Sequence, residues 1–261
     1  MTVKKAGLWI KQNWIYYLIG LTIIVGMKYF YSRAGTGELK WILAPTARWV
    51  RILSGISFTY ESRIGYVNHD LYFIIAASCS GVQFMIITIA TLIFSFVHRM
   101  ESKGKAAGWI VLSIGGAYVS TIMVNGLRII ISIGLPLVLS HSPLYRQQAI
   151  SGQITPETLH TVIGVAVYFT SLLLIHRAAG YVSQRMAGGR EYSAADNDRT
   201  HLPGYMVPAF WYVLIALGIP FLNHAYRNNA ENFIGYASLI LLVCMAVLLI
   251  CHLISVIKRH L

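Results

Sequence analysis

Three residues whose side chains work together in acyl transfer lie far apart in the sequence. Cys79 stands in AASCSGVQF, Arg128 in VNGLRII and His160 in PETLHTVIG. A thiolate is a nucleophile, an imidazole transfers protons, and a guanidinium stabilises a developing oxyanion. Together they could form and resolve a thioester, provided that the fold brings them to one place.

The surroundings of Cys79 predict that a helix begins just after it. Ser80 or Ser78 can cap a helix that starts near Gly81. The thiol would then lie beside the positive end of the helix, where thiolates are stabilised. Taken alone, however, a cysteine in an apolar stretch is more often a small core residue.

His160 is expected close to another helix start. Thr155 can serve as the N-cap, Pro156 fits the first helical position, and Glu157 belongs in the first turn. A positive charge is disfavoured at that end of a helix, so the imidazole would stay neutral and able to accept a proton. Glu157, three residues before His160, lies on the same helical face and could orient the ring.

Arg128 offers a fork of donors and a permanent charge. Beside a thiol it would favour the thiolate, and beside a reacting carbonyl it would stabilise the oxyanion. Asn125, one turn earlier on the same face, could add a further donor. His69, next to Asp70, competes with His160 for the role of base or orienting group.

The elements that must position these residues are membrane helices. The 261 residues are 56% hydrophobic and 11% charged, whereas an ordinary soluble domain has about 25% charged residues. The apolar residues form long runs of the kind that a bilayer core requires. We therefore predict an all-α, polytopic transmembrane helix bundle of about six spans (six to eight). The clearest runs are Trp14–Tyr31, Val82–Val97, Ala107–Val124, Thr161–Ile175, Val207–Leu222 and Ile234–Ser255.

The distribution of lysine and arginine predicts that both termini are cytoplasmic, because these residues collect on the inner side of the membrane. The short basic segment HRMESKGK (98–105) is the best single anchor. With this topology Cys79, Arg128 and His160 reach the outer membrane level on three consecutive spans. Leu39–Phe58 carries two arginines and is predicted to be interfacial or re-entrant. Ile129–Leu139 is too short to cross alone.

The chain divides into three predicted segments. Residues 1–182 would form a membrane catalytic core, 183–206 a polar cytoplasmic linker, and 207–261 a C-terminal helix pair. The net charge of +12 is spread over the ends of apolar segments and makes no basic face, so no nucleic-acid partner is expected. Cys244 and Cys251 are assigned to packing. The cysteine pattern predicts neither a disulfide framework nor a metal pair, and no cofactor is expected.

SCSG (78–81), NGLRI (125–129) and HTVIG (160–164), in this order, resemble the Cys, Arg and His motifs of the exosortase/archaeosortase family. The resemblance covers roughly residues 70–176. It implies Cys79 as nucleophile, Arg128 as its electrostatic partner and His160 as general base and acid. The chain is short for the family and lacks an appended soluble domain, so it looks like a compact bacterial subtype such as exosortase K.

The resemblance further implies a cysteine protease or transpeptidase of the bacterial inner membrane, with its active site facing the periplasm. Its partners would be membrane lipids and membrane-anchored proteins that carry a C-terminal, PEP-CTERM-like sorting signal. The alternative is a multi-spanning transporter that uses Arg128 to bind an anionic substrate. An intramembrane serine hydrolase ranks last, because the sequence has no GxSxG pattern.

Overall fold

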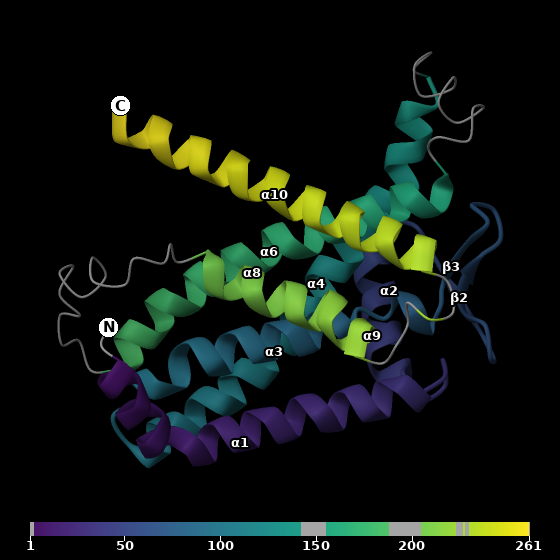
Figure 1. Cartoon of the computed structure of the whole chain (residues 1–261). Helices are drawn as coiled ribbons and strands as arrows, with labels where there is room; N and C mark the ends of the chain where they lie inside the picture. Colours follow the sequence, from purple (N-terminus) through teal and green to yellow (C-terminus); the bar gives the residue numbers. More distant parts are fainter. Residues whose placement is uncertain (1–2, 142–154, 188–204, 223–226, 228–229, 261) are drawn as a thin grey trace. The chain divides into compact units, whose positions relative to one another are not determined.

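Helices make up most of the part of the chain that the structure describes. This structure is a computed structural model, and it describes residues 3–141, 155–187, 205–222, 227 and 230–260 (Figure 1). The helices, in chain order, are α1 (Val3–Arg33), α2 (Lys40–Ser54), α3 (Val82–Phe96), α4 (Lys103–Leu139), α6 (Pro156–Met186), α8 (Met206–Val213), α9 (Ile219–Leu222) and α10 (Ala230–His260). The predicted all-α class is confirmed.

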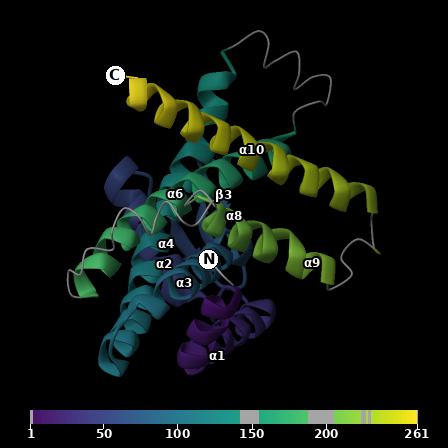
Figure 2. The same ribbon diagram turned by 60° about the vertical axis from the view of Figure 1, so that its left-hand side comes forward.

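Within the described ranges, five helical stretches are long and apolar enough to cross a membrane. They are Asn13–Arg33, Ala77–Arg99, Lys103–Leu139, Thr158–Met186 and Ala230–Ile254. The predicted span Val207–Leu222 coincides with a shorter apolar helix, Met206–Leu222. A π-helical turn, Leu214–Gly218, joins α8 to α9, and Figure 2 shows the two as one continuous rod.

α4 is a single helix of 37 residues, Lys103–Leu139, with Pro136 inside its last turn. At 1.5 Å per residue it is about 55 Å long, much longer than a hydrocarbon core of about 30 Å. The sequence pattern predicts a separate short stretch at Ile129–Leu139. Instead, this stretch extends the predicted span, so Arg128 lies within a helix and not at its end.

A small antiparallel sheet, absent from the predicted architecture, precedes Cys79. Its strands are β1 (Thr59–Glu61), β2 (Gly65–Asn68) and β3 (Phe73–Ile75), in the order β1-β2-β3. Tyr60 is paired with Tyr66, and Tyr66 with Ile75. Strands of three or four residues are too short to leave an alternating hydrophobic pattern. The sheet leads directly into the turn that carries Cys79.

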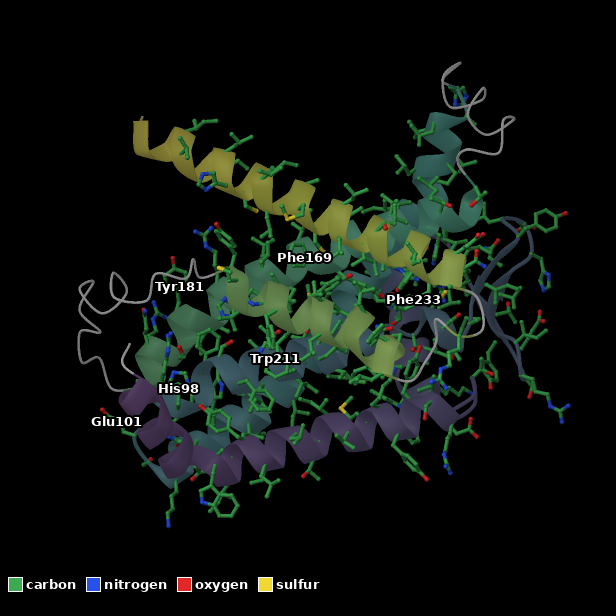
Figure 3. The ribbon with its side chains drawn as sticks, viewed as in Figure 1. His98, Glu101, Phe169, Tyr181, Trp211 and Phe233 are labelled. Carbon is green, nitrogen blue, oxygen red and sulfur yellow. The ribbon has the colours of Figure 1, made fainter. Side chains whose placement is uncertain are left out.

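The chain forms two compact units. The first unit comprises residues 1–32, 83–119 and 171–220. Within it, Phe94 of α3 stacks on Tyr17 of α1, with ring centroids 5.6 Å apart, and on Trp211 of α8, at 4.7 Å. Trp211 is labelled in Figure 3. The indole N–H of Trp109 donates to the carbonyl of Leu92 across 3.1 Å. α3 is therefore the buried centre of this unit.

The second unit comprises residues 33–82, 120–170 and 221–261. α2 turns a buried face inward while Arg48 and Arg51 remain exposed. The residues of this face are Ile42, Leu43, Thr46, Ala47 and Val50. Trp49 packs on Gly126 of α4, where a Cβ atom would lie only 2.6 Å from the indole Cδ1. At 15 residues, or about 22 Å, α2 is too short to cross a membrane. Its interfacial placement stays a prediction.

The predicted linker 183–206 falls mainly on 188–204, which lies outside the described residues. α6 continues to Met186, and α8 begins at Met206. The division into a catalytic core, a linker and a helix pair therefore stays a prediction.

Candidate active site

Cys79 lies at the end of a single 3₁₀ turn, Ala77–Cys79, between β3 and α3. Its N–H donates to the carbonyl of Ala76 across 2.9 Å. The fully buried Ser80 accepts a hydrogen bond from the N–H of Val82, the first residue of α3, with Oγ 3.4 Å from the nitrogen. A serine thus caps the helix beside the cysteine, as the sequence predicted.

Gly81 lets this turn lie directly against α4. Its φ is +76°, in the left-handed region that favours glycine. A Cβ atom at this position would lie 3.0 Å from the methyl group of Thr121 and 3.1 Å from the amide carbon of Asn125. The motif therefore needs glycine for two reasons, backbone conformation and close packing.

Arg128 and His160 are hydrogen-bonded neighbours. Arg128 Nη2 donates to His160 Nε2 across 3.2 Å. The Cys79 thiol interacts electrostatically with both the imidazole and the guanidinium. The structure thus brings all three predicted catalytic residues together within the second unit.

Arg128 is held in the interior, with 7% of its surface exposed. Its Nε is buried and has no hydrogen-bond partner among the described residues. A buried donor without an acceptor costs free energy, about 1 to 3 kcal/mol. An arriving oxygen atom would remove this cost, so the guanidinium is ready to bind an acceptor.

His160 lies in the second turn of α6, which begins at Pro156. Thr155 is the N-cap, since its hydroxyl accepts from the N–H of Thr158 across 3.1 Å. This confirms the predicted helix start. Because arginine only donates, Nε2 of His160 must accept, and the proton of the neutral ring is assigned to Nδ1. Glu157 lies in the first turn of α6, but its side chain is outside the described part of the structure.

Asn125 is hydrogen-bonded to the turn that carries Cys79. Its Nδ2 donates to the backbone carbonyl of Cys79 across 2.7 Å, and its Oδ1 accepts from the hydroxyl of Tyr168, also across 2.7 Å. From its place one turn before Arg128, Asn125 is predicted to be an additional donor beside the guanidinium. The donor exists, and in this structure the carbonyl of Cys79 uses it.

Tyr168 belongs to the site and was not predicted. Besides its bond to Asn125, its ring lies under Arg128, with the guanidinium carbon 5.3 Å from the ring centroid. Residues 160, 164 and 168 share one face of α6 because they are four residues apart. This spacing, with glycine in the middle, is the signal that could have identified Tyr168.

The competing candidates lie elsewhere. His69 is hydrogen-bonded to Glu61 across 2.7 Å in the small sheet, and its side chain is 75% exposed. Cys244 is buried in α10, as expected for packing. Across the described ranges, no three His, Cys, Asp or Glu residues gather as a metal site would require.

No family model, curated protein or solved structure matches this chain. The likeness to the exosortase/archaeosortase family therefore rests on the three motifs and on nothing broader. The chemistry of the site must be argued from its own geometry, which supplies a thiol, an imidazole and a buried guanidinium.

Proposed function

We propose that this chain is a membrane cysteine peptidase or transpeptidase of the exosortase kind. The observation that carries the proposal is the meeting of Cys79, Arg128 and His160, which come from a turn and two helices far apart in sequence. A nucleophile, a base within reach of it and a donor for the oxyanion are the parts of a thioester mechanism.

The first half of the reaction forms the thioester. His160 takes the thiol proton, and the Cys79 sulfur attacks the carbonyl carbon of the scissile peptide bond. Nε2 of His160 shares its lone pair with Arg128 in the resting site, so Arg128 must release it as the proton arrives. The imidazolium then repels the guanidinium, whose donors turn to the new oxyanion. The unpartnered Nε–H is available for this purpose.

The second half restores the enzyme. The tetrahedral intermediate collapses, the carbon–nitrogen bond breaks, and His160 returns its proton to the leaving amine. A water molecule or an acceptor amine then attacks the thioester, loses a proton to His160 and releases the Cys79 sulfur, which is reprotonated. Water would make the enzyme a protease, and an amine would make it a transpeptidase.

The proposed substrates are membrane-anchored proteins with a C-terminal, PEP-CTERM-like signal, which consists of a short motif, an apolar helix and a basic cluster. The proposed location is the bacterial inner membrane, with the site facing the periplasm. The apolar helices support membrane insertion, while the basic segment 98–105 supports the orientation. A substrate helix could lie along the bundle with its basic end in the cytoplasm.

The test is processing of a co-expressed, epitope-tagged protein that ends in such a signal. The wild type should produce a shortened product, and Cys79→Ala should produce none. Cys79→Ser should be nearly inactive, because a serine hydroxyl is far less ionised than a thiol. Cys251→Ala, in α10, is the matched control and should cleave normally. Normal processing by Cys79→Ala would end the proposal.

A further inference from the structure

The site contains a contact between α4 and α6 that the proposed mechanism does not use. Tyr168 of α6 bonds to Asn125 of α4 and also lies under the guanidinium of Arg128. We infer that Tyr168 is a positioning residue that sets both the turn carrying Cys79 and the plane of Arg128. This inference rests on the proposed function for its kinetic consequences, but not for its structural ones.

Tyr168 acts on the turn that carries Cys79 through the amide of Asn125. The carbonyl of Cys79 can only accept, so the amide must turn Nδ2 toward it. Oδ1 then points the other way and takes the hydroxyl of Tyr168. Without that hydroxyl the buried Oδ1 would lose its donor, and the amide would be free to rotate. The carbonyl of the nucleophile would then lose its anchor as well.

Tyr168 also acts directly on Arg128. Its guanidinium lies along the face of α6 formed by residues 160, 164 and 168. Nη2 bonds to His160, the carbon of the guanidinium lies over the ring of Tyr168, and Gly164 has no side chain to obstruct the space between them. A cation over an aromatic ring is attracted to it, more strongly when both are desolvated. Tyr168 therefore supports one face of the guanidinium, while His160 accepts a hydrogen bond from its Nη2.

Both contacts of Tyr168 act on groups that take part in the proposed reaction, the Cys79 turn and the Arg128 guanidinium. Catalysis depends on the separation of the reacting atoms, and an error of 1 Å in their position can cost about a hundredfold in rate. Tyr168 itself is not assigned contact with substrate. Its loss should therefore lower kcat and the reactivity of Cys79, while KM stays nearly constant.

The experiment uses the full-length chain in detergent with Cys244 and Cys251 replaced by alanine, so that Cys79 is the only thiol. The rate of its alkylation by iodoacetamide is measured, together with kcat and KM for the tagged substrate. Tyr168→Phe keeps the ring but removes the hydroxyl, so alkylation and kcat should fall about threefold to tenfold. Tyr168→Leu also removes the ring and should reduce both about thirtyfold or more.

Tyr181→Phe is the matched control, because Tyr181 is an exposed tyrosine on the same helix. It should leave both rates unchanged. A double-mutant cycle with Asn125→Ala adds a second test: the hydroxyl bonds to Asn125 and also interacts with Arg128, so Tyr168→Phe should cost less in that variant than in the wild type.

The inference is overturned if Tyr168→Phe keeps alkylation and kcat within about twofold of the Tyr181→Phe control. It is also overturned if only KM changes. Tyr168→Phe decides the matter even where Tyr168→Leu fails to fold, since it removes a single oxygen atom. If the wild type cleaves no substrate, the proposed function fails, whereas the alkylation rates still decide the role of Tyr168.

Discussion

Arg128 donates to His160, with Nη2 3.2 Å from Nε2, and this bond joins the second half of α4 to the first turns of α6. It also defines the resting state of the site. In the proposed mechanism, the lone pair of His160 that accepts a proton from Cys79 is already shared with a cation. Activation therefore requires Arg128 to move its donors elsewhere, and a substrate carbonyl is the natural acceptor.

The role of Arg128 can be tested by changing its shape while keeping its charge. Arg128→Lys retains a positive charge but loses the planar fork, so the cation cannot engage His160 and an oxyanion in turn. We expect kcat for substrate processing to fall about a hundredfold, as for the loss of one oxyanion donor, with little change in KM. Arg48→Lys, at an exposed position of α2, is the control and should be fully active.

Replacing Arg128 also distinguishes the proposed peptidase from the alternative transporter. If the chain were a transporter with an anionic substrate, Arg128→Ala would abolish uptake, and alkylation of Cys79 would leave uptake intact. The peptidase predicts that both changes abolish processing. If Arg128→Ala processed the substrate fully, Arg128 would not be the residue that stabilises the oxyanion.

Gly81→Ala should destabilise the fold more than an ordinary glycine replacement. Gly55 has nearly the same left-handed φ, +74°, but nothing lies within 4 Å of the position of its Cβ. Gly55→Ala therefore isolates the backbone cost, about 1 to 2 kcal/mol. Gly81→Ala adds crowding against Thr121 and Asn125, so its melting temperature in detergent should be the lower of the two. Equal melting temperatures would mean that the turn is not packed on α4 as described.

Gly164 makes room for Arg128 on the face of α6 that holds His160 and Tyr168. A Cβ atom there would lie 3.8 Å from Arg128 Cδ and Nη1, an ordinary contact distance. Gly164→Ala should therefore be active and, in a helix interior, up to about 1 kcal/mol more stable. Gly164→Leu should displace the guanidinium and abolish processing. Thermal unfolding and product analysis of both variants check this, and an active leucine variant would contradict it.

The parts of the site that the sequence predicted are those with local signals. The helix start at Pro156 follows from Thr155 and Pro156 themselves, and the capping of α3 follows from Ser80 beside Gly81. A long apolar run is likewise recognised from consecutive residues, and five of the predicted spans coincide with long helices. These features depend on neighbouring residues, so a single sequence is enough to reveal them.

The parts that were missed depend on partners remote in sequence. Tyr168 is one aromatic residue in an apolar helix until Asn125 and Arg128 pack against it. The strands before Cys79 are too short to show an alternating pattern. The continuation of α4 through Gly134 and Pro136 was hidden because both residues usually interrupt helices.

The orientation of the chain is tested by labelling intact cells with a membrane-impermeant maleimide. With the site facing outward, single-cysteine variants that retain Cys79 should be labelled. Those that retain only Cys244 or Cys251 should not, because α10 is an apolar candidate span and the polar reagent does not enter the lipid. The readout is the mass shift of each purified variant, and inside-out vesicles provide the reverse control. Labelling of Cys79 only in those vesicles would place the site on the cytoplasmic side, where an exported substrate could not reach it.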